Sequence, residues 1–166
     1  EECVVGFRVS LPETKGTKAS VFNTIDDLSA FLCTGYDLTR GNAIIDQDLA
    51  IYYGEYMEMP IYTTLNTHYW RMGGEAAFYA LAPHTYFLND YQEPVNIQMT
   101  GSGAIVEGHL DQDTCENTEI LIGEYIGEGI WDGDYKMLAA PINFVHTMAA
   151  VRFVMGDLAG KIPGYK

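Results

Sequence analysis

Apolar and polar residues alternate along much of this chain, and the alternation predicts β-strands rather than helices. Val5, Phe7 and Val9 fall on one face of a strand over residues 3–10, because successive side chains of a strand point to opposite faces. Further strands are predicted over residues 29–36, 49–57, 61–65, 95–100, 118–126, 137–146 and 149–155. Short strands at regular spacing, without a long segment of helical period, are typical of a β-sandwich or a barrel.

The segment 69–83 predicts a β-hairpin at the centre of the fold. Gly73-Gly74 separates two aromatic-rich runs, and a glycine pair readily adopts the positive φ angles of a tight turn. In the second run both faces of the strand are apolar, which predicts that it lies in the middle of a sheet. The core is predicted to contain Phe78, Ala80, Leu81, Phe144, Val151 and Phe153.

Residues 12–20 predict an exposed loop that a protease can reach. The stretch contains Lys15 and Lys18 and has no apolar anchor, and exposed loops of small and polar residues are preferred sites of cleavage. A plain surface connection is the alternative. Residues 37–48 and 101–117 are rich in turn formers and acids, and both predict solvated loops.

Length, composition and charge narrow the class of protein. A chain of 166 residues with 48% hydrophobic residues fits one β-rich globular domain over residues 1–166. Its net charge of −14 argues against nucleic acid as a partner, because a phosphate backbone would be repelled. No apolar run is long enough for a membrane span, so no transmembrane segment is predicted.

The reactive residue types form no recognisable catalytic or metal-binding pattern. The chain has no nucleotide-binding or nucleophile motif, and we expect neither enzymatic activity nor a cofactor. Asp111, Asp113 and Glu116 share a loop that lacks the glycine and the closing glutamate of a calcium loop. The four histidines, His68, His84, His109 and His146, are predicted to be structural or superficial, each without a second ligand beside it. Cys3, Cys33 and Cys115 allow at most one disulfide and leave one thiol over.

Four segments resemble the fimbrillin-like (Mfa-like) surface proteins of Bacteroidales. They are DLSAFLCTGY at 27–36, YW followed by GGEAAFYALAP at 69–83, NTEILIGEY at 117–125 and INFVHTMAAVRFVM at 142–155. Their order and spacing are similar to those of that family over about residues 22–156. Each segment is a predicted core strand, so the resemblance rests on their combination.

The resemblance implies a transthyretin-like or immunoglobulin-like β-sandwich of about seven to nine strands, corresponding to the family's N-terminal domain. It implies export as a lipoprotein precursor to the outer membrane and cell surface. The implied role is structural or adhesive, as a fimbrial subunit or as an anchor or tip. The implied partners are other fimbrial subunits through strand donation and, for adhesion, host or bacterial surface ligands or glycans. Val5, Phe7 and Val9 would then belong to a displaceable strand. Polymerising members are cut at an arginine after the first strand, whereas residues 12–20 offer only Lys15 and Lys18.

A carbohydrate-binding module is the alternative function. Sandwich domains bind glycans through exposed aromatic rings, and Trp70, Tyr86, Tyr91 and Trp131 are the candidates for such a platform. Exposed, coplanar rings on one face would favour sugar binding. Burial of Trp70 between strands would favour a structural role.

Overall fold

The protein is all-β in the part of the chain that the computed structural model describes, residues 1–12, 28–82, 97–100, 103–106 and 121–146. The strands are β1 (Glu2–Ser10), β2 (Ala30–Asp37), β3 (Asn42–Tyr56), β4 (Met59–Thr64), β5 (Tyr69–Arg71), β6 (Glu75–Ala82), β7 (Ile97–Thr100), β8 (Gly103–Val106), β9 (Leu121–Glu128), β10 (Ile130–Asp132) and β11 (Met137–His146). These residues contain no helix, and so none that could cross a membrane. The predicted all-β class is confirmed.

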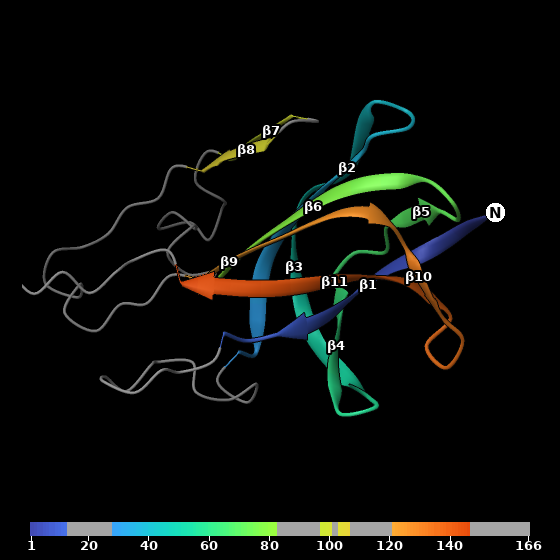
Figure 1. Ribbon diagram of the computed structural model, residues 1–166. Helices are drawn as coiled ribbons and strands as arrows, with labels where there is room; N and C mark the ends of the chain where they lie inside the picture. The colour runs from blue at the N-terminus through green and yellow to red at the C-terminus, as the bar shows by residue number, and fades with distance from the viewer. Residues whose placement is uncertain (13–27, 83–96, 101–102, 107–120, 147–166) are drawn as a thin grey trace, which may run out of the picture.

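Seven strands close into a barrel, which differs from the expected arrangement of two separate sheets. Neighbouring strands pair in the order β11, β9, β6, β2, β3, β4 and β1, and β1 then pairs with β11 to complete the ring. All pairings in the ring are antiparallel except the parallel pair of β1 and β11. The short strands β10 and β5 pair with β11 and β1 respectively. Figure 1 shows β1 between β11 and β4.

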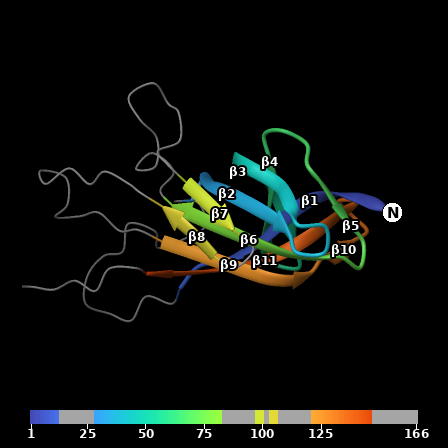
Figure 2. The same ribbon diagram turned by 90° about the horizontal axis from the view of Figure 1, so that it is seen from above.

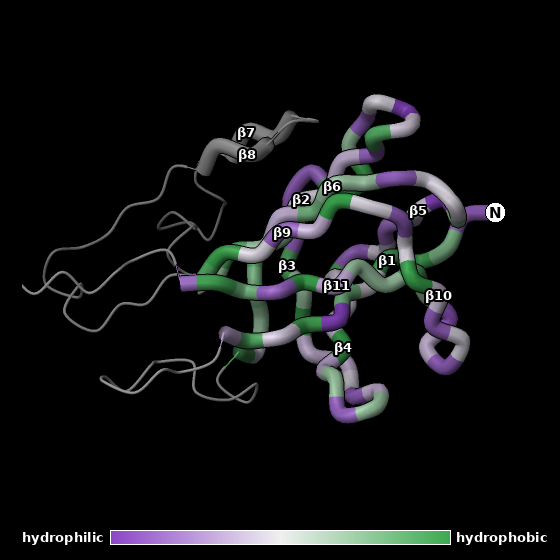
Figure 3. Tube along the Cα trace, viewed as in Figure 1, coloured by the Kyte–Doolittle hydropathy of each residue, from purple (hydrophilic) through white to green (hydrophobic). Residues whose placement is uncertain are grey.

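The barrel interior is filled by one face of each strand. Figure 3 shows the hydrophobic and hydrophilic residues along the strands, and along β9 the more buried residues alternate with exposed ones. The buried apolar side chains of the barrel join a single cluster around Phe7, Phe31 and Phe78. The predicted core residues Phe78, Ala80, Leu81 and Phe144 are buried as expected. Leu81 belongs to the outer face of β6, not to the central cluster. Val151 and Phe153 lie outside the described residues.

β6 is a central strand, but the predicted hairpin of β5 and β6 is wrong. β6 pairs with β2 on one side and β9 on the other, whereas β5 pairs with β1. The turn itself is where the glycines place it: Gly73 has φ of 74°, and the Gly74 N–H donates to Arg71 O at 3.0 Å. The chain therefore turns from one side of the barrel to another instead of folding back on itself.

Two predicted loops contain strand. β3 already begins at Asn42, so the stretch 37–48 is mostly a strand, with Ile45 fully buried. The acids there misled the prediction, because Asp37 and Asp48 are buried in the structure and only Asp46 is exposed. β8 occupies residues 103–106 of the second loop and forms a hairpin with β7. Figure 2 shows this hairpin over β2 and β6, and β7 contacts β2.

β11 is an inner strand although it contains Pro141, and a proline within a strand is usual only at an edge or a bulge. β11 lies between β1 on one side and β9 with β10 on the other. Its antiparallel partners cover residues 137–139 and 143–146 and skip the stretch between them. Pro141 falls in that interruption, where the lack of a backbone donor breaks no antiparallel pair.

Candidate functional site

β1 is the strand that closes the barrel, and it is held on both edges. Its pairing with β11 runs from Val4 opposite Met137 to Ser10 opposite Asn143. On the other edge, residues 2–4 pair with β5 and residues 6–8 pair with β4. Between these two pairings the Val5 N–H donates to His68 O at 3.0 Å. Removing β1 would thus open the ring between β4 and β11 and leave backbone groups of both strands unpaired.

The inward face of β1 fills the centre of the barrel. Val5 and Phe7 are 0% exposed and Val9 is 1% exposed. The Phe7 ring meets Phe31 and Phe78 edge to face, with ring centroids 5.6 Å apart in both pairs. Burial of each of these three side chains contributes about 1.5–3 kcal/mol to stability. The alternation in the sequence correctly identified this face.

The outer face of β1 carries a polar cluster made of Arg8, Tyr56, Asp132 and Tyr135, called the outer cluster below. Arg8 Nη2 lies 3.3 Å from Asp132 Oδ2, and the Asp132 side chain is 1% exposed. The Arg8 guanidinium lies over the Tyr56 ring, 5.4 Å from its centroid. The backbone N–H of Asp134 and that of Tyr135 donate to Asp132 Oδ1.

The outer cluster joins the β10–β11 turn to β1 and to the β3–β4 hairpin. Tyr135 donates its hydroxyl to Glu55 O at 2.7 Å, and its ring meets that of Tyr53 edge to face. Met137, Ala139 and Ile61 lie on the outer side of β11 and β4 and are nearly or fully buried. The turn therefore covers a second, smaller apolar region on the outside of the barrel.

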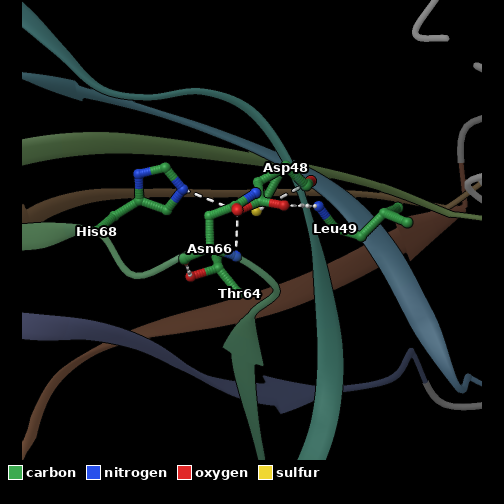
Figure 4. A network of polar contacts seen from close by, with 6 residues as sticks. Asp48, Leu49, Thr64, Asn66 and His68 are labelled. Atoms are coloured by element: carbon green, nitrogen blue, oxygen red, sulfur yellow. Dashed lines mark hydrogen bonds and ion pairs between the residues drawn. The ribbon is translucent and has the colours of Figure 1, made fainter.

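A buried carboxylate, Asp48, organises the segment that leads from β4 to β5. Asp48 Oδ1 accepts from the Leu49 N–H at 2.8 Å, and Oδ2 accepts from the Asn66 N–H at 3.0 Å. His68 Nε2 lies 2.8 Å from the same Oδ2, and Figure 4 shows these groups converging on the carboxylate. Thr64 donates its hydroxyl to Asn66 O at 2.6 Å. Because His68 O accepts from Val5, the network also supports the edge of β1.

Cys33 lies beside this network and is a buried thiol that stays protonated. Its thiol is fully buried and donates to Asp48 O at 3.4 Å. Burial raises the pKa of the Cys33 thiol well above its ordinary value, and the negative charge of Asp48 raises this pKa further. Since the thiolate is the reactive form, Cys33 is a structural residue. Cys3 and Cys33 are both free thiols, and Cys115 lies outside the described residues.

Comparison of the chain with protein-family models, with curated proteins and with solved structures gives no match. The geometry of the described residues and the pattern of the sequence are therefore the grounds on which function is proposed.

The aromatic residues named for a glycan platform do not lie together on one exposed face. Trp70 is 1% exposed, packs against Phe78 with centroids 4.9 Å apart, and donates its indole N–H to Gly74 O at 2.9 Å. It is a core residue, so its assignment to an exposed platform is wrong. Trp131 is 49% exposed. Tyr86 and Tyr91 lie outside the described residues.

The remaining predicted site residues fall partly outside the described residues. This is the case for Lys15 and Lys18 in the predicted cleavage loop, for Asp111, Asp113 and Glu116, and for His84 and His109. Within the described ranges no three side chains of His, Cys, Asp or Glu are grouped as metal ligands. His68 does lie beside a carboxylate, that of Asp48, so the expectation that no histidine has such a neighbour is wrong.

The two polar groups that flank β1 were not predicted from the sequence. Arg8 and Asp132 are 124 residues apart in the chain, and no local pattern connects them. Asp48 and His68 are 20 residues apart, and Asp48 falls in the stretch 37–48 for which the sequence predicts a loop. A usable signal existed for Asp48, since it lies between Ile45 and Ala50 in a stretch where strand alternation can be continued backward from residue 49.

Proposed function

We propose that this chain is a structural or adhesive subunit of a cell-surface fimbria that assembles by exchanging its first strand. The observation that carries the proposal is the position of β1, which alone closes the ring between β4 and β11 and fills its centre with Val5, Phe7 and Val9. A barrel that loses such a strand keeps a slot with two unpaired edges, which an extended segment of another subunit can fill by β-augmentation.

The resemblance to fimbrillin-like proteins supports the same proposal and extends it. On this reading the barrel is the closed form of that family's transthyretin-like sandwich, with β1 joining the two sheets at their edges. Export and attachment at the outer surface, and a stalk, anchor or tip position in the fimbria, belong to the proposal on the same ground. Among the described strands, β5 and β10 stand at the two ends of the strand order, and this position and the acidity of the chain agree with an extracellular assembly role.

A cut after the first strand should convert the protein from a monomer into an assembling species. We expect a lysine-specific protease to cut first at Lys15 or Lys18, because the sequence of residues 12–20 predicts a polar loop without an apolar anchor. The cut chain, once β1 leaves, should self-associate or capture an added strand peptide, while the uncut chain stays monomeric. Peptide mapping identifies the cut and size-exclusion chromatography with light scattering gives the mass.

The matched control is the double variant K15A and K18A, which should resist the first cut and remain monomeric. Lys136 is an internal comparison, because it lies exposed in the β10–β11 turn. First cleavage at Lys136, or a cut product that unfolds without accepting any strand, contradicts assembly by this route.

A further inference from the structure

The outer face of β1 restricts which residues a strand in this place can carry, and the restrictions differ from those of the inner face. Val4, Gly6 and Arg8 point away from the barrel centre, since they alternate with the inward-facing Val5 and Phe7. Any apolar strand of the right period could supply inward side chains. Selection of one strand over another therefore depends on the outer positions.

Position 6 has no space for a side chain while Met137 keeps its observed conformation. A Cβ atom built at Gly6 would lie 1.9 Å from Met137 Sδ and 3.1 Å from Met137 Cγ. Met137 is 4% exposed and belongs to β11, the strand that pairs with β1 along its whole described register. A larger residue in this position requires the Met137 side chain to move from its observed conformation.

Position 8 is matched to a cation. Asp132 Oδ1 is already occupied by two backbone N–H donors, and Oδ2 faces Arg8 Nη2 at 3.3 Å. The carboxylate is buried, with 1% exposure of its side chain. A neutral residue at position 8 would leave the buried Asp132 charge without its partner. Breaking a buried ion pair in this way costs far more stability than breaking an ion pair at the surface.

We propose that the slot occupied by β1 selects an incoming strand that carries glycine at the position of Gly6 and arginine at the position of Arg8. The partner is thus an extended segment of another subunit with the order apolar, glycine, aromatic, arginine, apolar. The Met137 side chain occupies the space that a side chain at position 6 would need, and the Asp132 carboxylate pairs with the positive charge at position 8. Tyr56 favours arginine over lysine, because the planar guanidinium lies over its ring. This inference rests on the strand exchange proposed above and specifies its partner.

The test is a competition among synthetic strands for the chain cut at Lys15 or Lys18. The reference peptide has the sequence of residues 1–12, and variants carry G6V, R8M or V4T, all under reducing conditions. We expect G6V and R8M each to bind at least about tenfold more weakly than the reference. V4T should bind like the reference, because it preserves the size of a half-buried side chain.

Changes in the slot should reverse these preferences. M137A should make room for the G6V peptide and recover most of its lost affinity. D132N keeps an oxygen that accepts from the two backbone donors and removes the charge. The R8M peptide should therefore bind the D132N variant as tightly as the reference peptide binds it. The peptide substitutions alone leave the protein unaltered, so a variant that fails to fold does not decide the outcome.

The outcomes separate the selection rule from strand exchange itself. Equal binding of the reference, G6V and R8M peptides overturns the rule while the exchange stands. Failure of even the reference peptide to bind overturns the exchange, and the rule with it. A double-mutant cycle of R8M and D132N in the uncut chain is an independent test. The combined effect on the unfolding equilibrium constant should differ from the product of the two single effects by at least about tenfold. Additive free energies would contradict the proposed pairing.

Discussion

Replacing Phe78 by alanine should lower the free energy of unfolding by about 3–5 kcal/mol, since the site has little freedom to collapse. The ring is 0% exposed and meets Phe7 and Trp70 edge to face. Its outer atoms lie over Gly35, where a Cβ atom would come within 2.5 Å of Phe78 Cε1. The ring therefore fills the space over Gly35, a position of β2 that has no side chain, and alanine would leave a cavity there.

Urea unfolding followed by tryptophan fluorescence measures this loss. The matched control is Ile126→Ala on the neighbouring strand β9, which removes an apolar side chain that is 55% exposed. We expect the control to lose less than about 1 kcal/mol, as is usual for surface positions. A loss below 1 kcal/mol for F78A would remove Phe78 from the centre of the core.

Replacing Asp48 by alanine should cost roughly 3 kcal/mol, the second largest effect. The carboxylate accepts hydrogen bonds from Leu49 N and Asn66 N and contacts His68 Nε2. Alanine would leave two backbone donors and a ring nitrogen without their acceptor, in a place where water has little access. The segment from Thr64 to His68 should loosen as a result, and with it the backbone bond from Val5 to His68.

Hydrogen exchange and urea unfolding together test this expectation. Asp46→Ala is the control, because Asp46 lies on the same strand, carries the same charge and is exposed, and it should change stability by no more than about 0.5 kcal/mol. D48A should also speed the exchange of the Val5 amide relative to the control. Equal stabilities of D46A and D48A would show that the network is dispensable.

The periodicity of the sequence was enough to locate most strands and one face of the core. Val5, Phe7 and Val9 alternate with more polar neighbours, and β6 is apolar on both faces, so both strands could be placed before their partners were known. Local pattern is reliable here because burial on one face is a property of the strand itself.

Strand pairing could not be read in the same way. Gly73 and Gly74 specify a turn, but the two strands that flank a turn pair only if the chain returns on itself, and here β5 continues the line of β4 along β1. Closure of the barrel depends on a parallel pairing of residues 4–10 with 137–143. Neither segment contains a pattern that identifies the other as its partner. For the same reason the Arg8 to Asp132 pair, which defines the outer face of the slot, was not predicted.

The measurement that tests the role of β1 most directly is strand replacement followed by native mass spectrometry. The chain cut at Lys15 or Lys18 is incubated with an isotope-labelled peptide of residues 1–15, in urea below the unfolding transition because the burial of three apolar side chains makes release slow. We predict that the labelled strand replaces the original one for one and that the product regains the thermal stability of the uncut chain, while uncut protein takes up no label. A cut protein that keeps its original strand until it unfolds, or that loses it and binds no labelled strand, would contradict the assignment of β1 as an exchangeable closing strand.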